Sequence, residues 1–161
     1  MNLQVSFDYQ LFDNELDLEA SLQTLLAAAR EATMLSYAPY SHFHVGAALL
    51  LSNGQIVKGS NQENASFPAG ICAERVALST ASSLYPGVKI AAIGIAYHSS
   101  ASADLPDNIL SPCGICRQSL LEVTDRQQEK IKVILSSTSG KIILLENAAY
   151  LLPLAFSASN L

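Results

Sequence analysis

The stretch that decides the fold is Phe43 to Ser60, which reads FHVGAALLLSNGQIVKGS. Two strand-like runs flank Ser52-Asn53-Gly54, and an Asn-Gly pair in that position is a strong signal for a β-hairpin. The sequence therefore predicts a strand over residues 43–51, a turn at residues 52–54 and a second strand over residues 55–60.

Outward from this hairpin, helical and strand-like patterns alternate. Before it, apolar residues recur at helical spacing between Glu15 and Leu35, which predicts a helix. After it we expect a polar loop over 61–70, a helix over 71–85, an apolar strand over 88–97, a polar loop over 98–111, a helix over 113–123 with Pro112 in its first turn, and strands over 130–136 and 141–145. This order predicts an α/β fold, a three-layer α/β/α sandwich around a five-stranded mixed sheet, and a single domain over residues 1–161.

Composition narrows the class of protein. Half of the 161 residues are hydrophobic, which suffices for one buried core. The net charge of −5 argues against a long nucleic-acid partner, which usually meets a basic face. No apolar stretch reaches 18 residues and no basic, apolar leader opens the chain, so we expect neither a membrane span nor a secretory signal. Three cysteines make an odd count for a disulfide framework, which predicts reduced thiols and a cytoplasmic enzyme.

Two short segments carry the chemistry: Cys72-Ala73-Glu74-Arg75 and Pro112-Cys113-Gly114-Ile115-Cys116-Arg117. Both open predicted helices, where the helix dipole and unpaired backbone amides stabilise thiolates. Cys113 and Cys116 are three residues apart and share one helix face, so they can bind one ion, and Cys72 completes three sulfur ligands. Three protein ligands leave a fourth position for water, which is the usual layout of catalytic zinc.

Two charged residues follow Cys72 directly. Glu74 places a carboxylate near the ion without making it a ligand, so it can take a proton from an acidified water and pass it to the substrate. Three thiolates and Zn²⁺ sum to a charge of −1, and an adjacent guanidinium offsets it. Arg75 and Arg117 are the candidates for this role.

Other interpretations of the cysteines remain open at this point. A Cys-x-x-Cys pair alone also occurs in structural and redox-active sites. A structural zinc site with four ligands would need a histidine, and the chain offers His42, His44 and His98, which we expect to have surface or packing roles. A catalytic zinc site gives a role to each of the three cysteines and to Glu74, which favours that interpretation.

From about Tyr37 to Phe156 the chain resembles the small cytidine deaminases, the homotetrameric type with three cysteine ligands. The resemblance is carried by residues 37–49, by the loop Asn61-Gln62-Glu63-Asn64-Ala65, by the two cysteine segments and by the C-terminal block Leu151-Leu152-Pro153-Leu154-Ala155-Phe156. Gln62, where the family commonly has an aliphatic residue, and a long loop over 98–108 depart from the family pattern.

The resemblance implies roles for individual residues. It implies strand order 2-1-3-4-5, zinc on the three cysteines and Glu74 as proton shuttle. It also favours Arg75 over Arg117 as the arginine that offsets the thiolate charge, because the family type with three cysteines has an arginine at that position. It implies that Asn61 and Glu63 bind the ribose hydroxyls, that Phe43 packs on the base, and that the backbone of Ala73 binds the pyrimidine edge. Phe156 matches an aromatic residue that reaches into the site of a neighbouring subunit, so a homotetramer is expected.

The function predicted from the sequence is zinc-dependent hydrolysis of free cytidine or deoxycytidine to uridine or deoxyuridine and ammonia. One alternative is a deaminase of another small aminopyrimidine nucleoside. The other is a non-catalytic zinc-binding interaction domain, which would have no use for the Glu74 carboxylate.

Overall fold

The computed structural model describes residues 1–99 and 107–161, with only the backbone described at residue 159. Six strands form one sheet in the order β1-β6-β5-β4-β2-β3. The strands are β1 (Gln10–Phe12), β2 (Phe43–Leu51), β3 (Ile56–Ser60), β4 (Ile90–Ser99), β5 (Lys132–Ser136) and β6 (Ile142–Leu145), and the main helices are α1 (Ala20–Thr33), α2 (Ala73–Leu84) and α3 (Gly114–Gln127).

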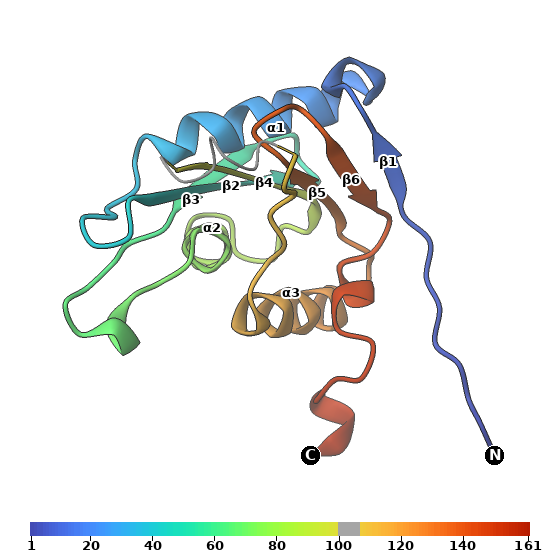
Figure 1. Cartoon of the computed structure of the whole chain (residues 1–161). Coiled ribbons are helices and arrows are strands. Elements are labelled where there is room, and N and C mark those ends of the chain that lie inside the picture. The colour runs from blue at the N-terminus through green and yellow to red at the C-terminus, as the bar shows by residue number, and fades with distance from the viewer. Residues whose placement is uncertain (100–106) are drawn as a thin grey trace.

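The sheet is the middle of three layers, as predicted (Figure 1). Helix α1 covers one face and packs a cluster that includes Leu25 and Leu26 against β4 and β5 residues such as Ile134. Helices α2 and α3 cover the other face, where Ile93 and Leu120 belong to a second buried cluster. Each fully buried Leu or Ile side chain contributes roughly 1.5–3 kcal/mol, so the two clusters hold the layers together.

Strand directions decide where the helices begin. Strand β2 is antiparallel both to β3 and to β4, so β3 and β4 run in the same direction and end at the same edge of the sheet. Helix α2 follows β3 and helix α3 follows β4. Both helices therefore begin near one edge, on one face. The β4–β5 pair is parallel, which makes the sheet mixed as expected.

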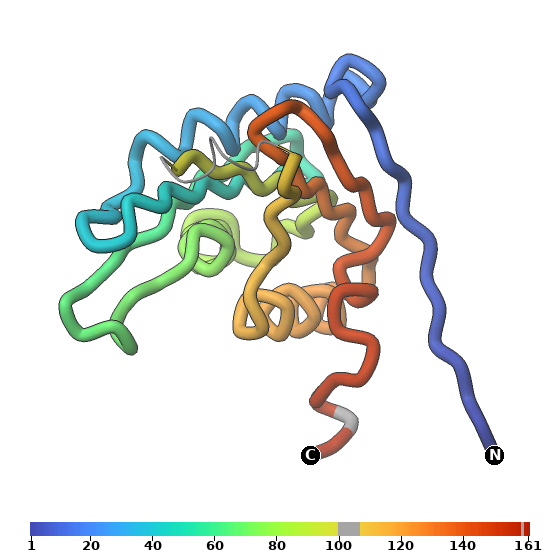
Figure 2. Tube along the Cα trace, in the orientation of Figure 1, coloured from blue at the N-terminus to red at the C-terminus, as the bar shows by residue number. Residues whose placement is uncertain are grey.

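The predicted strand order holds for the five expected strands, and a sixth strand extends it. Strand β1 pairs antiparallel with β6, with Leu11 opposite Ile143. A strand of three residues carries too little pattern to be predicted. Before β1 the chain is extended (Figure 2), and Phe7 stacks on Tyr150 with ring centroids 5.7 Å apart.

Two helix starts differ from the prediction. The helix expected from Glu15 is divided: Asn14 caps a short 3-10 turn at Glu15–Asp17, Leu18 is extended, and α1 begins at Ala20. Pro112 was expected in the first turn of its helix but precedes it, because Cys113 is the N-cap of α3.

The remaining boundaries agree within a few residues, and the Asn53-Gly54 turn forms with Gly54 at φ +84°. The predicted polar loop over 98–111 lies partly outside the described residues. Within the part of the chain that the structure describes, no helix combines the length and apolar character needed to cross a membrane.

Candidate functional site

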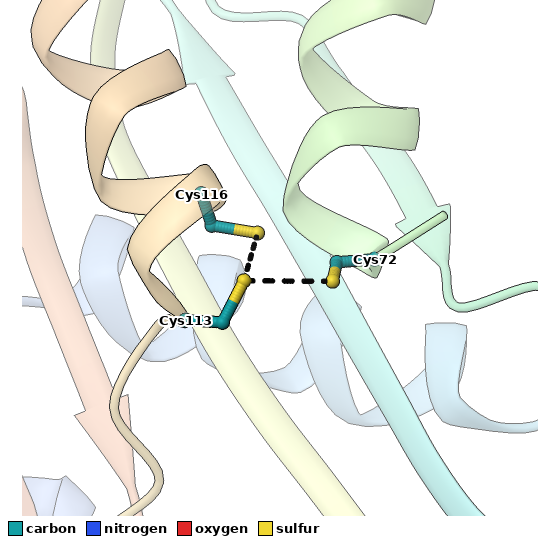
Figure 3. Close-up of side chains that lie close together, drawn as sticks. All are labelled: Cys72, Cys113 and Cys116. Atoms are coloured by element: carbon teal, nitrogen blue, oxygen red, sulfur yellow. Dashed lines mark hydrogen bonds between the residues drawn. The ribbon is translucent and has the colours of Figure 1, made fainter. Parts of the chain in front are cut away.

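Three cysteine side chains meet where α2 and α3 begin (Figure 3). Their Sγ atoms all lie within 4.8 Å of one another, with 3.8 Å between Cys72 and Cys113 and 3.5 Å between Cys113 and Cys116. A tetrahedral zinc ion with Zn–S bonds of about 2.3 Å separates its sulfur ligands by about 3.8 Å. The three thiols are therefore already spaced as ligands of one such ion.

The local fold explains why these thiols converge. Cys72 is the N-cap of α2 and Cys113 is the N-cap of α3, and no side chain caps either helix. The unpaired amides of each first turn favour negative charge, so both positions suit a thiolate. Cys116 lies one turn into α3 and is fully buried, with its sulfur on the side that faces the other two.

The pKa values of two of the thiols, Cys72 and Cys116, are shifted in opposite directions. A hydrogen bond from Cys116 lowers the pKa of the Cys72 thiol to about 6, and the nearby Arg75 cation acts in the same direction. The same hydrogen bond and burial raise the pKa of Cys116. Binding of a metal ion must therefore displace the proton that Cys116 holds.

Glu74 lies in the first turn of α2, beside this centre. Its side chain is almost fully buried, with 4 % of the residue exposed, and burial raises the pKa of its carboxyl. A raised pKa makes the carboxylate a stronger proton acceptor than an ordinary glutamate. Ala73, the first residue of the helix, is fully buried beside it.

A pocket of about 410 Å³ opens next to the thiols. This volume is within the range of small-molecule sites. It brings together the predicted residues Phe43, Asn61, Glu63, Ala73 and Glu74 with two of the cysteines. Its described lining is Ser41, Phe43, Val45, Asn61, Glu63, Cys72, Ala73, Glu74, Leu110, Ser111 and Cys113.

The side-chain amide of Asn61 extends the hairpin by two hydrogen bonds. Its Nδ2 donates to the Phe43 carbonyl at 2.9 Å, and its Oδ1 accepts from the Val45 amide at 2.8 Å. Asn61 therefore fixes the first residues of β2, and it retains one N–H and one lone pair for a ligand.

Glu63 holds the turn that precedes β2. Its carboxylate accepts hydrogen bonds from the Tyr40 amide at 2.9 Å, from the Ser41 amide at 3.3 Å and from the Ser41 hydroxyl. These bonds, the Ser41 hydroxyl first, lower the pKa of Glu63. A sugar hydroxyl that binds Glu63 would donate to the same carboxylate oxygens as Tyr40 and Ser41, or replace one of their hydrogen bonds.

The two arginines have different surroundings. Arg117 donates from Nε to the Pro112 carbonyl at 2.8 Å, and its Nη1 contacts the Leu151 carbonyl at 3.5 Å. It therefore ties the start of α3 to the C-terminal segment. Arg75 is half-buried, and its positive charge helps to lower the pKa of the Cys72 thiol.

Other predicted residues lie outside the pocket lining. Phe156 is 60 % exposed, so it is not a core residue of its own chain, and its carbonyl accepts from Gln118 Nε2 at 2.9 Å. Gln62 turns its amide to Ser60 Oγ at 3.0 Å and to the Leu35 carbonyl at 3.2 Å.

The histidines do not join the cluster of possible metal ligands found among the described residues, which contains the three cysteines alone. His44 instead contacts the Ser36 hydroxyl and stacks near His98, with ring centroids 6.3 Å apart. Sequence reasoning missed four lining residues: Ser41, Val45, Leu110 and Ser111. Ser41 lies in the quoted 37–49 block, whereas nothing in its local pattern marks Leu110.

The fold and this centre define a class of protein: a zinc-binding α/β/α sandwich with a buried carboxylate beside three thiols. Comparison with known proteins places it more closely. Residues 19–130 match the family model described as the cytidine and deoxycytidylate deaminase zinc-binding region. The chain therefore belongs to the family of cytidine and deoxycytidylate deaminases.

Relatives and solved structures agree with this family. A cytidine deaminase of Halalkalibacterium halodurans is 37 % identical over 139 residues, which cover 86 % of this chain and 96 % of that protein. The crystal structure of cytidine deaminase from Burkholderia pseudomallei matches with a TM-score of 0.70 and 38 % identity, over 83 % of this chain and 97 % of that one. Cytidine deaminase from Mycobacterium tuberculosis matches with a TM-score of 0.64 and 28 % identity, over 86 % and 98 %.

Proposed function

We propose that this chain is a zinc-dependent cytidine deaminase that converts cytidine or deoxycytidine and water to uridine or deoxyuridine and ammonia. The observation that carries the proposal is the buried Glu74 carboxylate, which lines the same pocket as the thiols of Cys72 and Cys113. A zinc site with a purely structural role has no need of a buried free carboxylate, whose burial is costly.

Cys72, Cys113 and Cys116 would hold the zinc ion, and the spacing of their sulfur atoms supports this assignment. When bound, the ion supplies Lewis-acid chemistry and lowers the pKa of a water molecule in its open fourth position. In this proposal Arg75 offsets the negative charge of the three thiolates.

The other pocket residues would bind and orient the nucleoside. Phe43 offers an aromatic face to the base, and the backbone at Ala73 offers polar groups to the pyrimidine edge. Asn61 and Glu63 would bind the sugar hydroxyls with the hydrogen-bonding capacity that their contacts to β2 and to the 40–41 turn leave available.

Glu74 would carry the protons of the reaction. In this proposal its carboxylate takes one proton from the attacking water and delivers it to ring nitrogen N3 of the base. It then takes the second proton of that water, from the hydroxyl newly bonded to C4, and delivers it to the exocyclic nitrogen, so that the C4–N bond breaks and ammonia leaves. The raised pKa of Glu74 supports this role, because the group then holds a proton readily between the two transfers.

We also propose that residues 1–161 form one domain, that the enzyme is a cytoplasmic homotetramer, and that Phe156 completes a pocket of a neighbouring subunit. All described strands belong to one sheet, which supports the single domain. The exposure of Phe156 supports its role between subunits.

The test is the variant Glu74→Gln. We expect one zinc per chain in both proteins, cytidine turnover in the wild type by loss of cytidine absorbance, and a rate about 10²–10⁴-fold lower in the variant, because proton transfer contributes about that much. Glu122→Gln, an exposed carboxylate on α3, is the matched control and should retain the wild-type rate.

Three results would contradict the proposal. A wild-type protein with bound zinc that leaves cytidine and deoxycytidine unchanged would indicate another nucleoside or a non-catalytic role. An active metal-free protein would remove the zinc assignment. Near-normal activity of Glu74→Gln would remove Glu74 as the proton carrier.

A further inference from the structure

Tyr97 is not among the described residues that line the pocket, yet it contacts two of the segments that do. It lies near the end of β4 and is only 8 % exposed. Its ring stacks on the ring of Phe43, with centroids 5.3 Å apart and ring planes inclined by 21°. This spacing and angle are typical of an offset-stacked aromatic pair.

The register of the sheet sets up this contact. Tyr97 lies directly opposite Val45 in the β2–β4 ladder, so Phe43, two residues earlier on β2, is its diagonal neighbour on the same face. Diagonal neighbours are within reach when the side chains are aromatic. Tyr97 therefore supports the ring of Phe43 from the neighbouring strand.

The hydroxyl of Tyr97 reaches a second segment. It donates a hydrogen bond to the carbonyl of Asn108 at 2.6 Å. Leu110 and Ser111, which line the pocket, lie two and three residues after Asn108, and Cys113 lies two residues after Ser111. One side chain thus contacts the aromatic wall of the pocket and the segment that leads to a predicted metal ligand.

We propose that Tyr97 is a positioning residue for substrate binding, which holds in place two parts of the pocket lining, the ring of Phe43 and the segment 108–111. This proposal rests on the proposed function, in which Phe43 packs on the base. A residue that serves only the core would need the apolar ring but not the hydroxyl, because a buried hydroxyl costs free energy unless it is bonded.

The experiment compares Michaelis constants for cytidine in the zinc-loaded protein. Tyr97→Leu removes both contacts, and we expect it to raise KM about tenfold with kcat within about twofold of the wild type, because the misplaced groups bind substrate and do not transfer protons. Tyr97→Phe keeps the stacking and loses the hydroxyl, so its KM should lie between the two.

A double-mutant cycle tests whether Tyr97 acts through Phe43. We expect Tyr97→Leu to raise KM less in a Phe43→Leu background than in the wild type, because the ring that it supports is already gone. Ile93→Ala is the matched control for lost packing, since Ile93 is fully buried on the same face of the same strand. It should lower the melting temperature and leave KM unchanged.

The proposal is overturned if Tyr97→Leu keeps the wild-type KM, if Ile93→Ala raises KM equally, or if the two leucine substitutions are fully additive. A wild-type enzyme that turns over cytidine in the same assay separates these failures from a failure of the proposed function.

Discussion

Single residues in the pocket are held by contacts that the sequence alone does not show. Asn61 bonds to backbone groups of β2 and Glu63 to backbone groups of the turn before it, so each shapes the pocket before it meets a ligand. Their assignment as sugar-binding residues came from resemblance to a family. Their positions on the pocket wall are a property of the structure.

Ser41→Ala should raise the pKa of Glu63 toward its ordinary value, because the Ser41 hydroxyl is the main group that lowers it. A carboxyl whose pKa is depressed by folding adds stability above its unfolded pKa and loses it as pH falls through the folded pKa. The variant should therefore lose less stability on acidification. Titration of the Glu63 carboxyl carbon by NMR measures the shift, with Ser83→Ala, which removes only a bond to Ser79 within α2, as control. An unchanged titration would contradict the prediction.

Arg75→Ala should lower activity about ten- to a hundredfold, more than it lowers zinc occupancy, because a charged neighbour of a metal centre tunes the ligands without holding the ion. Its cation also helps to lower the pKa of Cys72, so its loss should raise that pKa and move zinc uptake to higher pH. Zinc binding and turnover measured across pH check both effects. Arg126→Ala, an exposed arginine on α3, is the control, and equal profiles in the two variants would leave Arg75 without this role.

At the scale of elements, the position of α2 depends on how closely it approaches the sheet. An added Cβ at Gly59 on β3 would lie 2.5 Å from the Ala73 carbonyl and 2.4 Å from the Ala77 amide nitrogen. Both contacts are with the backbone of α2. Only glycine at position 59 lets the backbone of α2 come this close to β3. This close packing sets the distance of the Cys72 N-cap from the sheet.

Gly59→Ala should therefore shift α2 and destabilise the protein by about 1–3 kcal/mol or more, as overpacking does. Because Cys72 and Glu74 move with the start of the helix, zinc affinity should also fall. Urea denaturation and a zinc competition assay measure the two effects. Gly94→Ala, whose added Cβ would approach no atom closer than 3.4 Å, should be milder in both, and the reverse order would refute the prediction.

At the scale of the whole molecule, the C-terminal segment remains exposed on the single chain. Leu154 is 86 % exposed and Phe156 is 60 % exposed, and neither belongs to the two buried apolar clusters of the sandwich. An exposed apolar tail is typical of a segment that contacts another subunit.

Phe156→Ala should raise KM for cytidine without a change in zinc content or secondary structure. If each pocket draws on two chains, oligomers that mix Phe156→Ala chains with Glu74→Gln chains contain some intact sites, so their activity should exceed the average of the parents. Leu161→Ala, another exposed apolar residue of the tail, should show neither effect. A fully active monomer by light scattering would refute the shared pocket and leave the zinc chemistry intact.

The sequence by itself determined the features that depend on neighbours along the chain. The Asn53-Gly54 turn and its two strands, and the existence of a helix after Cys72 and another after Cys113, follow from turn and periodicity signals that act over a few residues. The identity of the possible zinc ligands also came from spacing, since Cys113 and Cys116 are one helical turn apart.

Only the tertiary structure decided which distant segments meet. Cys72 lies 41 positions from Cys113, and their sulfur atoms come to 3.8 Å because β3 and β4 run in the same direction and both helices begin at one edge of the sheet. The pairing of β1 and the stacking of Tyr97 on Phe43 depend on sheet register in the same way. Such contacts join residues far apart in the chain, so no local pattern encodes them and only the packed sheet brings them together.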